Sequence, residues 1–394
     1  MAKAQSQGKL RAWWWHKQAL DGRMEGAAPA KVLAETGWAR SLGGVGPYFT
    51  LLARAGTSRE AADGAVAALE MHELPAARNC TYVVPAADFA LALKVGFGFS
   101  TELKTVGKLG VTEAEIAKLC KAVVRALEKG PLDPDGIREA VGPAARSLGE
   151  EGKKKGVTTT LPVALNLLQT DGEIRRISVN GRFDQQRYRY TLWRPNPLAQ
   201  SKLAPEEALA ELARRFFHWI GPASVGEFQT FAGVSGKAAK AAIEPLGLAA
   251  FDEQRLMLPA DREAFESFQP PKQAQYRLLS SIDGLWLLRG DLQSMVNAED
   301  FARIVTQGPK GDLRDLPSHA IVDRGRVVGI WEYDPEARAI AWLPFVARNR
   351  DLEKAVAQTE EYIRVQLGDA RSFSLDSLKS RQPRLAALRK AAGG

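Results

Sequence analysis

A short segment that recurs along the chain constrains the fold more than any other sequence feature. Residues 130–142 read GPLDPDGIREAVG, and residues 221–233 read GPASVGEFQTFAG. Both begin with Gly-Pro, carry a helix N-cap residue at the fourth position (Asp133 or Ser224), and end on a glycine that can close a helix. Residues 26–37, GAAPAKVLAETG, form a looser third copy. This recurrence predicts a fold assembled from similar units.

The segments around each copy predict one order of elements. An amphipathic helix precedes each copy, and a second helix follows it before a pair of strands. The preceding helices are expected at residues 10–20, 112–127 and 205–220, and the following helices at residues 59–71, 160–168 and 237–246. The strands are expected at residues 77–84, 174–178 with 187–193, and 250–258. Helix, short helix, helix and ribbon is the order of a winged helix.

We therefore predict an α+β fold, mainly α, with three tandem winged-helix units and a C-terminal α+β cap domain. The boundaries are expected at residues 1–100, 105–198, 199–270 and 271–394. In the last region, residues 277–288 and 320–345 alternate apolar and polar side chains, which predicts antiparallel strands, and a helix is expected over residues 350–365. The alternatives are three helical hairpins with no role on DNA, or winged helices that bind protein.

The charge balance favours an anionic partner. Lys and Arg number 54 against 46 Asp and Glu, which gives a net charge of +8 and a pI near 9.4. Cys80 and Cys120 lie far apart, so neither a disulfide framework nor a cysteine-rich zinc site is expected. The sequence predicts no cofactor, no metal, no membrane segment and no signal peptide. We expect a cytoplasmic, nucleoid-associated protein that is monomeric.

Basic residues gather in three stretches that are candidates for contact with double-stranded DNA. They are Lys153, Lys154 and Lys155, the middle-unit wing with Arg175, Arg176, Arg182, Arg187 and Arg189, and the helix with Lys237 and Lys240. Arginines that alternate with aromatic residues on a hairpin suit phosphate binding and stacking. The alternative for the wing is that its arginines face water and neighbouring acids.

Four segments, taken in order, resemble the AlkZ/YcaQ-like DNA glycosylase family. They are residues 10–22 (LRAWWWHKQALDG), 80–91 (CTYVVPAADFAL), 278–291 and 319–331 (HAIVDRGRVVGIW). The resemblance implies tandem winged helices that wrap DNA. It also implies a monofunctional glycosylase that hydrolyses the N-glycosidic bond of bulky N-alkylated purines or crosslinks. A non-catalytic DNA-binding protein, such as a regulator or a damage-recognition factor, is the alternative.

The chain departs from this family at the motif that the resemblance places in the first unit. Family members resemble one another in a Gln-x-Gln or Gln-x-Asp motif that orients water towards the sugar C1′. Here residues 37–48, GWARSLGGVGPY, contain neither Gln nor a carboxylate.

The remaining polar groups of the first unit supply the catalytic candidates. Since an alkylated purine is already a good leaving group, one polar group that positions water can suffice. The candidates are His16, Gln18 and Ser41, with Arg40 as a contact to phosphate or an abasic sugar. Alternatively, Trp13, Trp14 and Trp15 pack the core and His16 is only a surface residue.

Overall fold

The first unit is built around a long helix whose tryptophans are buried. The computed structural model describes residues 2–96, 102–184, 187–305 and 316–392. Trp13, Trp14 and Trp15, near the end of the first helix, are each at most 3% exposed. The elements of this unit are α1 (Ala2–Lys17), α2 (Pro29–Thr36), β1 (Ala39–Arg40), α3 (Gly46–Ala55), α4 (Arg59–Ala67), β2 (Met71–Pro75), β3 (Thr81–Pro85) and α5 (Phe89–Gly96). Its strands form an antiparallel sheet in the order β1-β3-β2.

This unit differs from the prediction in its second half. The helix expected over residues 59–71 ends at Ala67, and the strand β2 begins at Met71. The helix α3 was not expected, because residues 43–46 are rich in glycine and Val45 offers no side-chain cap. Burial stabilises it instead, since nine of its ten residues lie in the interior.

The middle unit follows the predicted order closely. Asp133 caps the short helix, because its Oδ1 accepts a hydrogen bond from the backbone N–H of Gly136 at 2.8 Å. Leu132 bridges to Tyr190, which joins this segment to the ribbon of the unit. The elements are α6 (Glu102–Gly107), α7 (Glu113–Leu127), α8 (Pro134–Val141), α9 (Gly149–Lys154), α10 (Leu161–Thr170), β4 (Ile174–Ser178) and β5 (Tyr188–Leu192).

The third unit shows the same capping chemistry. Ser224 Oγ accepts from the N–H of Glu227 at 3.1 Å, and Glu227 Oε2 accepts from the N–H of Ser224 at 2.6 Å. Gly233 ends the helix with a left-handed φ of +73°. The elements are α11 (Pro205–Ile220), β6 (Ala223–Ser224), α12 (Val225–Ala232), α13 (Gly236–Ile243), β7 (Ala249–Ala250), β8 (Arg255–Met257) and α14 (Pro259–Ser267). The three strands are antiparallel.

The C-terminal region contains the largest sheet, antiparallel in the order β12-β11-β10-β9. Residues 284–288, expected as strand, lie in a helix. Asp283 caps it by accepting from the N–H of Leu285 at 2.9 Å, and Gly290 closes it with a φ of +59°. The elements are β9 (Tyr276–Leu279), α15 (Gly284–Arg289), α16 (Ala298–Val305), β10 (His319–Asp323), β11 (Arg326–Asp334), β12 (Ala339–Pro344), α17 (Arg350–Tyr362), the π-helical turn η6 (Ile363–Leu367) and α18 (Leu378–Ala392).

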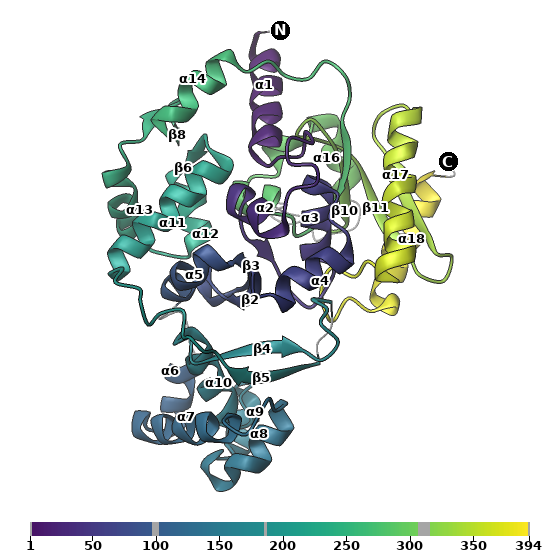
Figure 1. Ribbon diagram of the computed structural model, residues 1–394. Helices are drawn as coiled ribbons and strands as arrows, with labels where there is room; N and C mark the ends of the chain where they lie inside the picture. The colour runs from purple at the N-terminus through teal and green to yellow at the C-terminus, as the bar shows by residue number, and fades with distance from the viewer. Residues whose placement is uncertain (1, 97–101, 185–186, 306–315, 393–394) are drawn as a thin grey trace.

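The hydrophobic core is divided unequally among these regions. One cluster of buried side chains runs from α1 through α11 and α12 to the C-terminal sheet. The middle unit has a cluster of its own, around residues such as Leu119, Ile137 and Leu168. Figure 1 shows this unit as a separate lower lobe, which the β4–β5 ribbon connects to the rest.

The coarse prediction of a mainly helical chain with small antiparallel sheets is confirmed. The assignment of three winged-helix units and their boundaries stays a prediction, and the expected end of the first unit at residue 100 lies outside the described residues. None of the described helices is long and apolar enough to cross a membrane.

Candidate active site and nucleic-acid interface

A carboxylate lies where the first unit meets the ribbon of the middle unit. Glu73 belongs to β2, and Ser41 directly follows β1 in the same sheet. The hydroxyl of Ser41 donates a hydrogen bond to Glu73 Oε1. Arg176 of β4 forms an ion pair with Glu73 Oε2 at 3.2 Å, and its guanidinium lies 4.9 Å from the ring centre of Tyr188. Two units thus contribute to one polar cluster.

A cavity of about 250 Å³ opens beside this carboxylate. Since a water molecule in the liquid occupies about 30 Å³, the cavity has room for several waters. Its lining residues come from α4, β2 and the middle wing, and they are Asp63, Val66, Ala67, His72, Glu73, Arg175, Arg176, Ile177, Ser178, Gly181, Arg182, Phe183 and Tyr188.

Burial and the neighbouring charges affect His72 and Arg176, which both line the cavity, in opposite directions. Burial, together with the charges of Arg175 and Arg176, lowers the pKa of His72 to about 3, so this imidazole is neutral. Burial is also the largest single influence on Arg176 and lowers its pKa, but the Glu73 carboxylate, Tyr190 and Tyr188 together outweigh burial, so the pKa of Arg176 is raised. Within the described part of the chain, neither ring nitrogen of His72 has a hydrogen-bond partner.

This arrangement can position water against an electron-poor carbon. Each carboxylate oxygen has two lone pairs, so Glu73 can accept from a water while it is bonded to Ser41 and Arg176. Its side chain is 24% exposed, which leaves it accessible from the cavity. Sequence reasoning selected Ser41 but missed Glu73. The available signal was a carboxylate in a short strand, MHELP, whose only other polar side chain is His72.

Gln18 lies in the core and is not among the residues that line the cavity beside Glu73. Its side chain is fully buried. Its Nε2 donates to the carbonyls of Thr36 at 2.7 Å and Trp219 at 2.9 Å, and its Oε1 accepts from Arg54 Nη2 at 2.6 Å. These three contacts argue against the predicted catalytic role and indicate that Gln18 joins elements of the core.

His16 lies partly exposed at the surface, which agrees with the alternative prediction that it is only a surface residue. Its side chain is 36% exposed, and its Nδ1 is 2.6 Å from Asp21 Oδ2. The neighbouring tryptophans serve the core, because the indole N–H groups of Trp13 and Trp14 donate to the carbonyls of Gly221 and Pro222. His16 is not among the residues that line the cavity beside Glu73.

The wing arginines divide into two groups. Arg176 and Arg182 point inward, because Arg176 pairs with Glu73 and Arg182 pairs with Asp184. Arg175 is half-buried and lines the cavity. Arg187, directly before β5, and Arg189 within it are exposed and alternate with Tyr188 and Tyr190. Arg187 and Arg189 can therefore reach a phosphate without breaking the ion pairs of Arg176 and Arg182.

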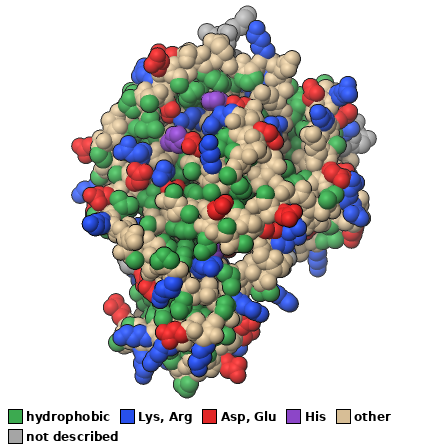
Figure 2. Space-filling view, in the orientation of Figure 1, with side chains coloured by type: hydrophobic (Ala, Val, Ile, Leu, Met, Phe, Trp, Pro, Cys, Tyr) green, Lys and Arg blue, Asp and Glu red, His purple; other side chains and the backbone are tan. Residues whose placement is uncertain are grey.

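The other predicted DNA contacts are distributed over the molecule. Lys154 and Lys155 are exposed, and Lys153 is paired with Glu150 at 2.6 Å. Lys237 and Lys240 are exposed on α13, which Figure 1 shows in the upper body, apart from α9 and the ribbon. Figure 2 shows the cationic side chains of the lower lobe interspersed with acidic ones.

Arg40 is engaged within its own sheet. Its guanidinium lies 5.2 Å from the ring centre of Tyr82, and its Nη1 donates to the carbonyl of Thr81 at 3.1 Å. A contact to phosphate would therefore have to replace or share these bonds.

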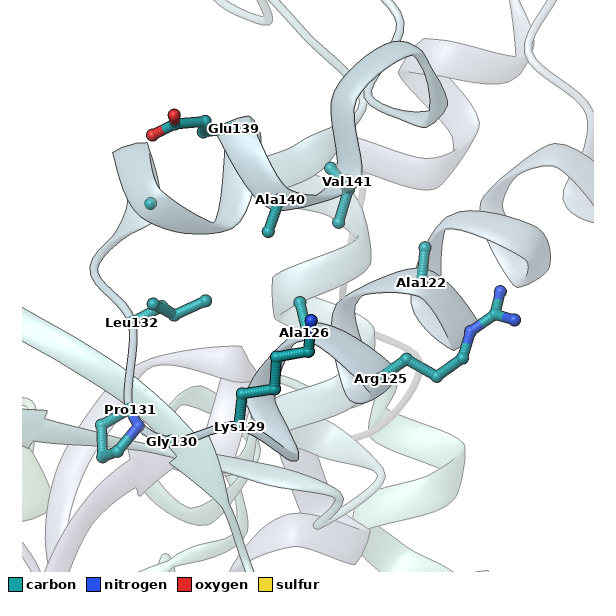
Figure 3. Close-up of a pocket in the computed structure, with 11 residues that line it drawn as sticks. Ala122, Arg125, Ala126, Lys129, Gly130, Pro131, Leu132, Glu139, Ala140 and Val141 are labelled. Carbon is teal, nitrogen blue, oxygen red and sulfur yellow. The ribbon is translucent and has the colours of Figure 1, made fainter.

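A larger depression, of about 860 Å³, lies between α7 and α8 (Figure 3). Its rim carries Arg125 and Lys129, whereas the carboxylate of Glu139 points away from the space between the helices. It therefore offers cations and apolar surface but lacks the paired carboxylate and hydroxyl found beside β2. The smaller cavity at Glu73 is the better candidate for chemistry.

The fold is that of a solved DNA-repair enzyme. The structure of Streptomyces sahachiroi DNA glycosylase AlkZ superposes with a TM-score of 0.69 at 19% sequence identity, covering 93% of this chain and 98% of that chain. The sequence model described as DNA glycosylase AlkZ-like matches residues 45–364. The chain belongs to this AlkZ-like DNA glycosylase family, as the resemblance predicted. No match was found among curated proteins. The matched range includes Glu73 and Arg176 and begins after Ser41.

Proposed function

We propose that this protein is a monofunctional DNA glycosylase that hydrolyses the N-glycosidic bond of bulky N-alkylated purines or crosslinks in double-stranded DNA. The observation that supports this most directly is the Glu73 carboxylate, held by Ser41 and Arg176 beside a cavity with room for water. Membership of a DNA glycosylase family supports the reaction class.

The proposed reaction makes small demands on the protein. The bond between C1′ and the alkylated purine breaks, and its electron pair neutralises the cationic base. Water bonds to C1′ and releases its proton to Glu73, whose negative charge also stabilises the positive charge that develops on the sugar. Ser41 and Arg176 act as positioning residues, because they hold the carboxylate rather than touch the substrate.

The size of the cavity is consistent with a base that stays in the duplex. The cavity accommodates water beside Glu73, and a bulky alkylated base does not need to enter it. Such a mechanism avoids the unstacking energy of full base flipping, on the order of a few kcal/mol.

The proposal also includes the arrangement of the protein on DNA. Three winged-helix units at residues 1–100, 105–198 and 199–270 and the C-terminal domain at residues 271–394 would bind as a monomer, in the cytoplasm and at the nucleoid. The net charge of +8 and the exposed Arg187 and Arg189 support this partner.

The second candidate function is a non-catalytic protein that recognises damaged DNA. It is favoured by residues 37–48, which contain no Gln and no carboxylate where the family resemblance places the water-orienting motif.

Single-turnover excision from duplex DNA with N7-alkylguanine, read as strand cleavage at abasic sites, tests the enzyme. We expect Glu73→Gln to slow excision by roughly 10²-fold or more and Ser41→Ala by roughly tenfold, with DNA affinity nearly unchanged. Glu70→Gln is the matched control, because Glu70 is exposed and lies three residues earlier.

If the wild-type protein binds alkylated duplex and releases no base, the enzyme proposal is wrong and the non-catalytic function takes its place. If Glu73→Gln excises at the normal rate, another residue positions the water.

A further inference from the structure

Two apolar side chains project from the loop between η6 and α18. We call residues 370–377 the apolar loop. Phe373 is 40% exposed and Leu375 is 81% exposed. Exposed apolar groups that lie together, rather than singly, mark a surface that binds something.

The exposure of these side chains is not a result of a loosely held loop. The N–H of Ser374 donates to the carbonyl of Leu42 at 3.0 Å, and the N–H of Val45 donates to the carbonyl of Arg371 at 3.0 Å. A Cβ on Gly44 would lie 2.4 Å from the carbonyl oxygen of Ser372, so only glycine permits this approach. The loop is therefore packed against the segment that follows Ser41.

The apolar loop also touches the tip of the middle wing. Arg371 Nη2 donates to the carbonyl of Asp184, and Arg182 Nη2 donates to the carbonyl of Leu367 at 3.0 Å. In Figure 1 this C-terminal segment, in yellow, meets the end of the β4–β5 ribbon. The segment that carries Phe373 and Leu375 is thus held both at the wing tip, by Asp184, and at Leu42, which follows Ser41.

The charges of the loop fit a polyanion. Its one carboxylate, Asp376, is 2% exposed, accepts from the N–H of Ser372 and is paired with Arg384 at 2.8 Å. Lys379 is exposed at the start of α18. The outward face therefore combines apolar and cationic groups, which is the combination that architectural DNA-binding proteins use to enter a groove.

We propose that the apolar loop is a wedge, and that Leu375 and Phe373 enter the base stack of duplex DNA beside the damaged nucleotide. The inference rests on the proposed function. The loop contacts the same wing that carries Arg187 and Arg189. With these arginines on phosphates, partial unstacking by the loop opens access to C1′ without extruding the bulky base.

The test is the fluorescence of 2-aminopurine placed next to a stable N7-alkylguanine analogue in a duplex saturated with protein. We expect the wild-type protein to raise the fluorescence, since unstacking relieves quenching. Phe373→Ala and Leu375→Ala should abolish most of this rise and weaken binding by about tenfold. The salt dependence of binding should not change, because no phosphate contact is lost.

Val365→Ala is the matched control, because Val365 is 67% exposed but lines a different cavity with Tyr276 and Glu25. A normal fluorescence rise in both loop variants overturns the wedge and leaves the glycosylase proposal standing. A wild-type protein that unstacks DNA and excises no base supports the wedge while the enzyme proposal fails. A protein that binds no duplex overturns both, and an apolar protein partner is then the next candidate.

Discussion

At the scale of single residues, a buried ion pair joins the first unit to the C-terminal region. The side chains of Arg54 in α3 and of Asp283, the N-cap residue of α15, are 1% and 0% exposed, and Arg54 Nη2 lies 2.8 Å from Asp283 Oδ1. Arg54 also donates to Gln18 Oε1 and to the carbonyl of Thr50. Burying two charges is unfavourable by several kcal/mol per ion unless nearly every donor and acceptor is satisfied, and these bonds meet most of that need.

We therefore expect Arg54→Met to lower the free energy of unfolding by about 3–5 kcal/mol, because it leaves the buried Asp283 carboxylate without its cation and Gln18 Oε1 without the Arg54 donor. Arg59→Ala is the control, since its partner Asp63 and Arg59 itself are partly exposed, and it should lower stability by less than about 1 kcal/mol. Urea denaturation measures both. Equal losses in the two variants would contradict the structural role assigned to this cluster.

At the scale of elements, the β4–β5 ribbon presents different chemistry on its two sides. Tyr188 lies beside Arg176 and faces the first unit, whereas Arg187 and Arg189 are exposed. Successive side chains of a strand point to opposite faces, so this division follows from the alternation along β5. One side holds the carboxylate of Glu73, and the other is available for DNA.

Replacing Arg187 and Arg189 by Ala should weaken binding to all duplex sequences and flatten its salt dependence. Each lost phosphate contact removes roughly 0.9 from the slope of log K against log salt, so the expected change is roughly 1.8. Fluorescence anisotropy over a range of salt concentrations measures it. Lys237→Ala with Lys240→Ala tests α13 in the same way. An unchanged slope in the arginine variant would exclude this side of the ribbon from the interface.

At the scale of the whole molecule, the middle unit has a core of its own. Its main cluster draws only on residues between Leu119 and Leu192, with a smaller cluster around Val106 and Val163. The remaining regions share two larger clusters, one that contains Trp14 and Trp219 and one that contains Phe49 and Trp331. The lower lobe is therefore the part whose folding depends least on the rest of the chain.

A fragment of residues 105–198 is expected to fold by itself, because the buried side chains of its main cluster have their partners within it. Circular dichroism and a cooperative thermal transition test this. Trp193, which packs against His72 and Phe89 in the whole chain, should become solvated and shift its emission to the red. An unfolded fragment would show that the predicted boundaries do not enclose a domain.

The sequence alone predicted those elements whose causes are local. Asp133 and Ser224 cap their helices by bonds to residues three positions away, and the ribbon of the middle unit pairs over a short connection. It did not predict α3, whose ends carry no side-chain cap, or α15 in a segment that reads as a strand. Those helices depend on burial by distant segments and on competition between local signals.

The candidate site was decided by tertiary structure. Ser41 could be selected from the sequence because the family resemblance pointed to its segment. Glu73 and Arg176 come from different units, and no spacing along the chain relates them. Likewise, the sequence around Gln18 does not tell whether its side chain faces solvent or the core. Only its contacts with Thr36 and Trp219 show that it lies in the core. Helix caps depend on neighbours in sequence, whereas a charged cluster depends on which surfaces pack together.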